Sequence, residues 1–386
     1  MILIKNGLTY TMETAPEKMD ILVEDGKIKA LGHNLNVPED CDVIDANGKM
    51  VFPGFIDAHC HLGMWEDAIG FEGADGNEMT DPITPELRAI DAINPLDRTF
   101  EESRNGGVTC CASGPGSANV IGGQFAVIKT VGDRVDDMIV KAPLAMKCAF
   151  GENPKRVYSE KKKSPMTRMA IAAELRNALA KAKEYNEKLE AAKDDPTKKP
   201  GFDMKMEALL PVIRGEMPLK AHAHRADDIL TSIRIAKEFG VKITLEHCTE
   251  GHLISHHIAE EGLSVVVGPS FGDRSKFELK NLTFETPGVL AAAGIKVAIM
   301  TDHPVVPLHY LPMCAGLSVK AGMEEEEALK AITINAAEIL EVEDRVGSIK
   351  VGKDADIVVW DKHPFELDSH VLTTIIDGQV VYQKAE

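Results

Sequence analysis

The sequence predicts an α/β protein that combines a (β/α)₈ barrel of the TIM type with a small β-sandwich formed by both termini. Strand-like runs separated by tight turns occupy residues 1–50 and 344–386, whereas strand-like and helix-like segments alternate over residues 51–343. Such alternation is typical of α/β proteins with parallel sheets. The alternating region offers eight candidate strands, which is the number that a closed barrel requires.

Each end of the chain contains a hairpin signal. Asp25-Gly26 lies between two apolar runs near the N-terminus, and Asp377-Gly378 lies between two such runs near the C-terminus. An Asp-Gly pair between strand-like runs favours a tight β-turn. Neither set of short strands looks complete alone. We therefore expect residues 1–50 and 344–386 to assemble into one composite β-sandwich.

The central region contains the strands that would form the barrel. They are residues 51–61, 107–112, 125–129, 142–150, 219–222, 241–247, 263–267 and 296–302. Helices fit between them, for example residues 226–239 before Gly240, a residue type that favours helix ends. An Ala-, Lys- and Glu-rich segment around 160–200 interrupts the alternation. We expect it to be an inserted, solvated helix followed by a polar loop.

Composition narrows the classes of partner and the location of the protein. The formal net charge of −18 argues against nucleic acid and anionic membranes as partners, because both require a basic surface. The seven cysteines include no Cys-x-x-Cys pair, which fits reduced thiols in a cytosol. No apolar run approaches the ~18 residues of a membrane span. We expect a cytoplasmic protein that acts on a small molecule, with homo-oligomer formation left open.

Potential metal ligands lie at the predicted carboxyl ends of strands, where active sites of such barrels are built. His59 and His61 end the first strand and share one of its faces, because alternate strand residues point the same way. His222 follows the fifth strand, His247 the sixth and Asp302 the eighth. Each residue alone fits a structural role at a strand end. Together, four imidazoles and a carboxylate predict a catalytic zinc-type site.

Longer motifs surround these residues. They are Pro53-Gly54-Phe55-Ile56-Asp57-Ala58-His59-Cys60-His61, His222-Ala223-His224, Glu246-His247, Thr301-Asp302 and the tail over residues 347–360. Together they resemble the amidohydrolase superfamily, in the branch of imidazolonepropionase-related and dipeptidase-like enzymes. The resemblance implies that the metal ligands are His59, His61, His222, His247 and Asp302. It also implies one or two divalent ions, with zinc as the first choice and iron, manganese or nickel as alternatives.

Two ligand positions have alternatives. His224 shares a strand face with His222, so either could bind the metal, and the family's spacing favours His222. At the fourth strand, members with two metals place a bridging carbamylated lysine or a glutamate. Glu152 is preferred here because it follows the apolar run, toward the mouth of the barrel, and Lys147 is the alternative. A buried, unmodified Lys147 would be costly. If neither residue reaches the metal, the site holds one ion.

Further residues are candidates for contact with substrate. They are His224 and Arg225 after the fifth strand, Gln124 after a glycine pair, and Lys155 and Arg156 after the fourth strand. Lys155 and Arg156 could hold a substrate carboxylate, since guanidinium suits bidentate recognition. Each also has a structural alternative, as a turn residue for Gln124 and as solvated loop charges for Lys155 and Arg156.

The expected reaction is metal-dependent hydrolysis of a carbon–nitrogen bond in a cyclic amide, a dipeptide or an N-acyl amino acid. A bound metal would lower the pKa of water from about 15.7 toward about 7 and polarise the scissile carbonyl. Asp302 and His247 are the expected catalytic residues, with Asp302 acting as general base and then general acid. Two alternatives remain: a deaminase of a ring amidine on the same scaffold, and a non-catalytic homologue that has lost its metal.

Overall fold

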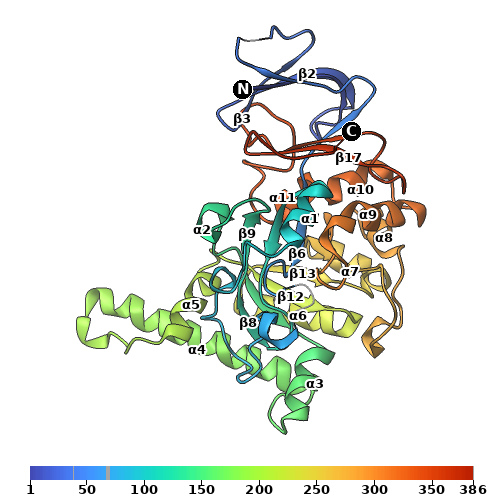
Figure 1. The fold of residues 1–386 in the computed structure, drawn as a ribbon. Coiled ribbons are helices and arrows are strands. Elements are labelled where there is room, and N and C mark those ends of the chain that lie inside the picture. The colour runs from blue at the N-terminus through green and yellow to red at the C-terminus, as the bar shows by residue number, and fades with distance from the viewer. Residues whose placement is uncertain (38, 67–69, 386) are drawn as a thin grey trace.

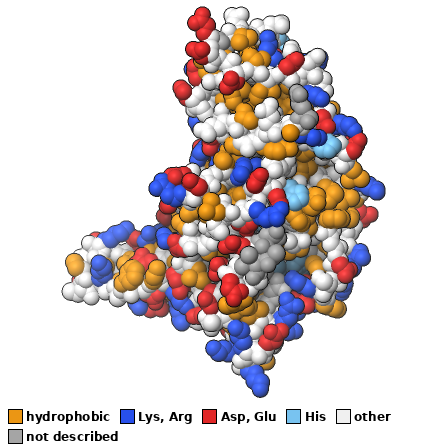
Figure 2. Space-filling model, viewed as in Figure 1, with side chains coloured by type: hydrophobic (Ala, Val, Ile, Leu, Met, Phe, Trp, Pro, Cys, Tyr) orange, Lys and Arg blue, Asp and Glu red, His pale blue; other side chains and the backbone are white. Residues whose placement is uncertain are grey.

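The computed structural model describes residues 1–37, 39–66 and 70–385. Figure 1 shows a β-sheet unit that contains both chain ends and a larger α/β body next to it. Among the described residues, no helix has the length and apolar character needed to cross a membrane. All seven cysteines are unpaired. Acidic and basic side chains are interspersed over the face drawn in Figure 2.

Strands from both ends of the chain share one eight-stranded sheet. Its order is β18-β17-β16-β5-β1-β2-β3, and β4 also pairs with β1. The strands are β1 (Ile2–Thr9), β2 (Glu17–Glu24), β3 (Lys27–Gly32), β4 (Asp42–Asp45), β5 (Met50–Pro53), β16 (Ile357–Trp360), β17 (Val371–Ile376) and β18 (Gln379–Gln383). The sheet branches at β1, which pairs first with β4 and then with β5. The two chain ends meet where β5 pairs antiparallel with β16.

The chain leaves this sheet at Gly54 and enters β6 (Phe55–Cys60) of the α/β body. A Cβ atom at Gly54 would lie 2.0 Å from Thr109 Oγ1, so the close approach of the two segments requires a residue without a side chain. The predicted first strand, residues 51–61, is therefore divided between two sheets. Its first part completes the terminal sheet, and its second part carries His59 into the α/β body.

The α/β body contains a four-stranded sheet of order β10-β9-β7-β6 and a six-stranded sheet of order β15-β14-β13-β12-β11-β8. The strands are β7 (Val108–Ser113), β8 (Ile121–Gln124), β9 (Ala126–Lys129), β10 (Ile139–Lys141), β11 (Met146–Ala149), β12 (Leu219–Ala223), β13 (Ile243–His247), β14 (Val265–Val267) and β15 (Val297–Ile299). β6 and β7 are parallel, and β11 to β15 are parallel to one another. Within each parallel set, the carboxyl ends share one edge.

The predicted strand at residues 125–129 runs against its neighbours. β9 is antiparallel to β7, and β8 is antiparallel to β11. The chain from 121 to 129 thus lies between the two parallel sets and runs in the opposite direction. The mixed α/β class is observed, but eight parallel strands are not found among the described residues, because one position of the expected set is reversed.

Helices cover the outside of the α/β body (Figure 1). They are α1 (Thr99–Asn105), α2 (Val135–Met138), α3 (Glu152–Glu160), α4 (Arg168–Asp194), α5 (Met204–Ile213), α6 (Ala226–Phe239), α7 (Ser255–Glu260), α8 (Thr286–Ala292), α9 (Leu311–Lys320), α10 (Glu325–Ala331) and α11 (Ile334–Ile339). The helix predicted before Gly240 is α6, and Gly240 ends it with a φ of +66°. A left-handed glycine at this position satisfies the last carbonyl groups of a helix.

α4 is the inserted helix, and it is less solvated than its composition predicts. It starts after Thr167, whose hydroxyl accepts a hydrogen bond from Ala170 N. Ile171, Leu175 and Leu179 are buried in the same core as residues of α5 and α6. Most of α4 is therefore packed on the body, and its C-terminal end extends away from the body as an arm (Figure 1).

Candidate metal centre

A cavity of about 490 Å³ opens at the carboxyl ends of the strands. His61 after β6, His222 on β12 and Asp302 after β15 all line it. His59 and His247 are buried beside these residues, with ring centroids of His222 and His247 4.1 Å apart and those of His59 and His61 5.5 Å apart. All five predicted ligands thus lie at one end of the α/β body.

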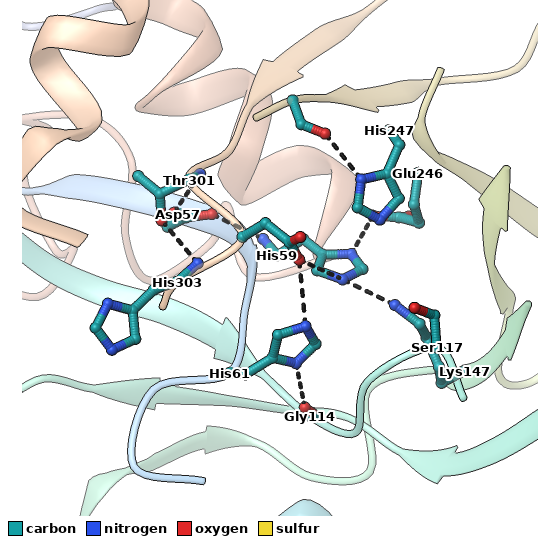
Figure 3. A network of polar contacts seen from close by, with 12 residues as sticks. Asp57, His59, His61, Gly114, Ser117, Lys147, Glu246, His247, Thr301 and His303 are labelled. Atoms are coloured by element: carbon teal, nitrogen blue, oxygen red, sulfur yellow. Dashed lines mark hydrogen bonds and ion pairs between the residues drawn. The ribbon is translucent and has the colours of Figure 1, made fainter. Parts of the chain in front are cut away.

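The first group of ligand atoms comes from His59, His61 and Asp302. His59 and His61 are labelled in Figure 3. Asp302 Oδ1 lies 3.2 Å from His61 Nε2 and 3.7 Å from His59 Nε2. The Nδ1 atoms of both histidines form hydrogen bonds. His59 Nδ1 donates to Glu246 Oε2 at 2.7 Å, and His61 Nδ1 donates to the Gly114 carbonyl at 2.6 Å. These hydrogen bonds fix the tautomer that leaves Nε2 as the electron-pair donor, which is the arrangement found in metal-binding histidines.

The second group consists of His222, His224 and His247, whose ligand atoms all lie within 4.8 Å of one another. His247 Nδ1 donates to the Gly268 carbonyl at 2.8 Å. His247 Nε2 and both ring nitrogens of His222 are buried without a hydrogen-bond partner among the described residues. Buried polar atoms normally find partners, so the three unsatisfied nitrogens fit a group that binds there. Nitrogen and carboxylate donors together suit a divalent transition metal.

Lys147 lies at the first group. Its Nζ is 2.9 Å from His59 Nε2, and Figure 3 shows its side chain pointing toward the histidines. Burial lowers the pKa of Lys147 to about 8, although the carboxylates of Asp302 and Glu246 act in the opposite direction. A lysine with such a pKa is partly a neutral amine near neutral pH.

Glu152, the other candidate for the fourth strand, has different neighbours. It is the first residue of α3, and its Oε2 accepts a hydrogen bond of 3.2 Å from Glu278 N. Its own N donates to Glu278 Oε2 at 3.0 Å. It belongs to neither group of ligand atoms in the described part of the chain. The structure therefore brings Lys147, rather than Glu152, next to the predicted ligands.

Four histidines of the site, His59, His222, His224 and His247, have lowered pKa values that favour the neutral form. Burial keeps the pKa of His59 well below its ordinary value, and the nearby Lys147 ammonium lowers it further. Burial likewise keeps the pKa values of His222 and His247 well below the ordinary value, and it lowers that of His224 to about 3. Neutral imidazole is the form that binds metal ions.

Two buried carboxylates that the sequence analysis did not single out hold the ligands in place. Glu246 Oε2 accepts from His59 Nδ1 and also lies 2.9 Å from Lys220 Nζ. Asp57 Oδ1 accepts from His59 N at 2.9 Å, and its Oδ2 accepts from Thr301 N at 2.9 Å. Burial raises the pKa of Asp57 to about 7. Both residues could have been identified from the sequence by their positions in the motifs, because Asp57 lies two residues before His59 and Glu246 directly precedes His247.

Two predicted ligands have backbone conformations that L-residues seldom adopt. His247 has a φ of +71°, and Asp302 has a φ of +54°. Both residues lie at the ends of parallel strands, at the positions where the chain turns toward the cavity. Left-handed conformations outside glycine persist where the surrounding structure determines them, and they cluster at functional sites.

The predicted substrate contacts are placed unequally. His224 lines the cavity, whereas Arg225, Gln124, Lys155 and Arg156 do not. Arg225 pairs with a neighbouring aspartate, and Gln124 Nε2 donates to a loop carbonyl at 3.2 Å. Lys155 and Arg156 are exposed on α3. Of these five candidates, the geometry brings His224 to the cavity.

Comparison with known proteins identifies the family. The model of the amidohydrolase family matches residues 50–381. Amidohydrolase tasK of Hapsidospora irregularis is 30% identical over 427 aligned residues, which cover 97% of this chain and 42% of that protein. An imidazolonepropionase of Symbiobacterium thermophilum is 24% identical over 88% of this chain and 83% of its own length. The chain belongs to the amidohydrolase family, and it spans less than half of the length of the Hapsidospora relative.

A solved structure also resembles the whole chain. The crystal structure of an amidohydrolase from Thermotoga maritima MSB8 is 47% identical in sequence and has a TM-score of 0.97. The alignment covers 100% of both chains. The terminal sheet and the α/β body are therefore arranged in that protein as they are here.

Proposed function

We propose that this chain is a metal-dependent hydrolase that cleaves a carbon–nitrogen bond in a small molecule. One observation carries the proposal. The Nδ1 atoms of His59, His61 and His247 are all hydrogen-bonded to carbonyl or carboxylate oxygens, which leaves three Nε2 atoms beside His222 and Asp302. Five potential ligands at the ends of four strands fit a divalent ion, with zinc as the first choice.

We also propose that the two sheets of the α/β body form one barrel. Contacts between the ends of β6 and β15 support closure: His61 N donates to the His303 carbonyl at 2.9 Å, and Asp57 Oδ2 accepts from Thr301 Oγ1 at 2.6 Å. In this description, the predicted region 51–343 forms the catalytic domain, except that its first residues, 51–53, belong to β5 of the terminal sheet. Residues 1–50 and 344–386 form the composite β-domain together with them.

The bound ion would supply a Lewis acid that polarises the substrate carbonyl and lowers the pKa of a water molecule. His59, His61, His222, His247 and Asp302 would hold it. Asp302 accepts the proton of the attacking water and returns it to the leaving nitrogen. Its Oδ1 suits this role, because it is buried at the cavity without a hydrogen-bond donor among the described residues. His247 contributes as a ligand whose orientation is fixed by its bond to a backbone carbonyl.

Lys147, rather than Glu152, is the fourth-strand residue that we assign as one that would hold metal. The neutral amine adds carbon dioxide and loses one proton to form a carbamate, which provides two oxygen ligands. The position of Nζ beside His59 and the lowered pKa of Lys147 both favour this addition. Glu152 is the less suited candidate, because its carboxylate is engaged with Glu278.

Metal analysis tests the centre. The purified protein should contain one or two equivalents of a transition metal, and Lys147→Met should lower that number while Glu152→Gln leaves it unchanged. Bicarbonate should assist metal uptake by the wild type but not by Lys147→Met. Protein that remains active after complete removal of metal would overturn the proposal.

Substrate screening tests the reaction. The panel comprises N-acyl amino acids, dipeptides, cyclic ureides and lactams, together with ring amidines. Hydrolysis of an amide or ureide supports the proposed function. Release of ammonia from ring amidines alone would favour the deaminase alternative, and inactivity of the metal-loaded protein on every class would favour a non-catalytic homologue.

A further inference from the structure

The cavity wall carries one ammonium group, that of Lys276. It is the single Lys or Arg among the described residues that line the cavity. Lys276 lies after β14 and directly before the 3₁₀ helix Phe277–Leu279, and it is half-buried. In the described part of the chain, no carboxylate forms an ion pair with it within 4.0 Å. The carboxylate of Glu278 interacts with it electrostatically from beyond that distance. A half-buried cation that faces a cavity and forms no direct ion pair can bind a negatively charged ligand.

The positive charge of Lys276 interacts electrostatically with His222 and His224. After burial, the Lys276 ammonium is the next cause of the low pKa of His224. It also contributes to the low pKa of His222. Lys276 also lines the same cavity as His61, His222 and Asp302, so one small molecule in that cavity can contact both the ammonium and the proposed metal ligands.

The rest of the cavity offers neutral polar groups and apolar surface. Asn153 Nδ2 donates to Ser117 Oγ at 2.8 Å, and Asn153 Oδ1 is buried without a hydrogen-bond partner among the described residues. Trp65 and Leu279 add apolar surface. These groups can accommodate an amide and an apolar side chain, and Lys276 supplies the positive charge of a wall that also carries Asp273 and the predicted ligand Asp302.

We propose that the substrate carries a carboxylate and that Lys276 binds it. This assignment rests on the proposed function, and it narrows the substrate class to compounds that carry a carboxylate, such as N-acyl amino acids or dipeptides, over uncharged cyclic amides. An anion entering this site also meets Asp302 and the overall charge of −18, so a local cation is needed to offset the repulsion. Lys276 takes the role that the sequence suggests for Lys155 and Arg156, which are exposed on α3.

Paired substrates test the assignment. N-acetyl-L-leucine and N-acetyl-L-leucinamide have nearly the same shape and differ in the charge at one end. Lys276→Met should lower kcat/KM for the acid by roughly 10- to 100-fold, the range for a hydrogen bond to a charged group. Most of the loss should appear in KM, and the amide should be affected by less than about twofold. Lys276→Arg should retain most of the preference for the acid.

Two matched variants control for a general effect of charge. Lys280→Met removes a lysine four positions along the same segment, whose ammonium lies 5.0 Å from the centroid of the Phe277 ring. Lys155→Met removes the cation that the sequence favours. Neither residue lines the cavity, so neither variant should change the ratio between acid and amide.

The outcomes separate this assignment from the proposed function. Equal hydrolysis of acid and amide by the wild type, or equal losses on both in Lys276→Met, overturns the role of Lys276 and leaves the hydrolase intact. If neither compound is hydrolysed, calorimetric titration of the same pair decides. Tighter binding of the acid that Lys276→Met abolishes supports the assignment, and equal binding overturns it. The proposed function fails if the whole panel of carbon–nitrogen substrates remains uncleaved, or if activity persists after complete removal of metal.

Discussion

Replacing Asp302 by asparagine would test the proposed proton transfer with little change in shape. Asp302 lines the cavity, and its Oδ1 lies 3.2 Å from His61 Nε2. Its φ of +54° is in the left-handed region, where asparagine is accepted about as readily as aspartate. The Asp302→Asn variant would therefore keep the backbone conformation, whereas alanine would add strain. A loss of activity in Asp302→Asn then reports on the charge and on the ability to accept a proton.

The magnitude follows from two effects. General acid–base catalysis contributes roughly 10²- to 10⁴-fold, so turnover should fall by at least about 100-fold, which corresponds to about 2.7 kcal/mol. A weaker metal site adds to this loss unless metal is supplied in excess. The stability should change by less than about 1 kcal/mol, because Oδ1 makes no hydrogen bond with the described residues that folding would lose.

Three measurements separate these effects. Turnover is measured with saturating metal, the bound metal by elemental analysis, and folding by circular dichroism. Asp273→Asn is the matched control, since it removes the same charge from another residue of the cavity wall, and it should lose less than about tenfold. Near-normal turnover of Asp302→Asn at full metal occupancy would refute the role of Asp302. His224 would then be the next residue to test as the proton acceptor.

Three further predictions concern the support of the site and the fold. Lys129→Met should lower the free energy of unfolding by about 3–5 kcal/mol, because the buried ammonium of Lys129 lies between carboxylates, 2.6 Å from that of Asp356. The control Lys141→Met removes an exposed ion pair and should lower this free energy by less than about 1 kcal/mol. Urea denaturation measures the free energy of unfolding of both variants. Glu246→Gln should weaken metal affinity roughly 10- to 100-fold in a chelator competition, because the carboxylate orients His59. Removing residues 344–386 should leave insoluble protein, because β5 loses its partner strand and its apolar face becomes exposed; a soluble, stable truncation would show that the two ends are independent.

The convergence of the ligands follows from rules that a sequence contains. Alternate residues of a strand share a face, which brings His59 and His61 together. Parallel strands end at one edge, which brings His222 and His247 together on the adjacent strands β12 and β13. Positions at strand ends are therefore accessible to prediction, because both rules depend on local sequence alone.

The direction of a strand is harder to predict from the sequence than the position of its end. An apolar run such as residues 125–129 has the same pattern whichever way it runs, so the reversed position of β9 has no signal within the strand itself. A neighbouring feature that a sequence does contain is Gly123 on β8, which has a φ of +128° and whose Cβ would lie 2.5 Å from the Leu87 carbonyl oxygen. A glycine is required there because the loop before it crosses β8 closely. The glycine pair at this site serves strand packing.

The choice between Lys147 and Glu152 depends on side-chain length. Glu152 lies further along the chain toward the mouth, which makes it the natural candidate if only backbone position is considered. Lys147 lies earlier, on β11, but its four-carbon stem carries Nζ to within 2.9 Å of His59 Nε2. The chain also turns into α3 at Gly151, which directs Glu152 toward Glu278. Distance along a strand therefore misjudges which residue reaches the centre.

The position of Lys276 in the cavity wall could not be predicted from the sequence. It lies in a segment of about 268–282 that has no long strand or helix, so no periodicity indicates which side chains face inward. Its importance depends on which other cations are absent from the described cavity wall, and that is a property of the folded surface. Lys155 and Arg156 have the same charge and follow a strand end more closely, yet they are exposed on α3. In the proposed function, the strand ends supply the metal ligands and the loops supply the cation for the substrate, which agrees with the general division of roles between strand ends and loops on such folds.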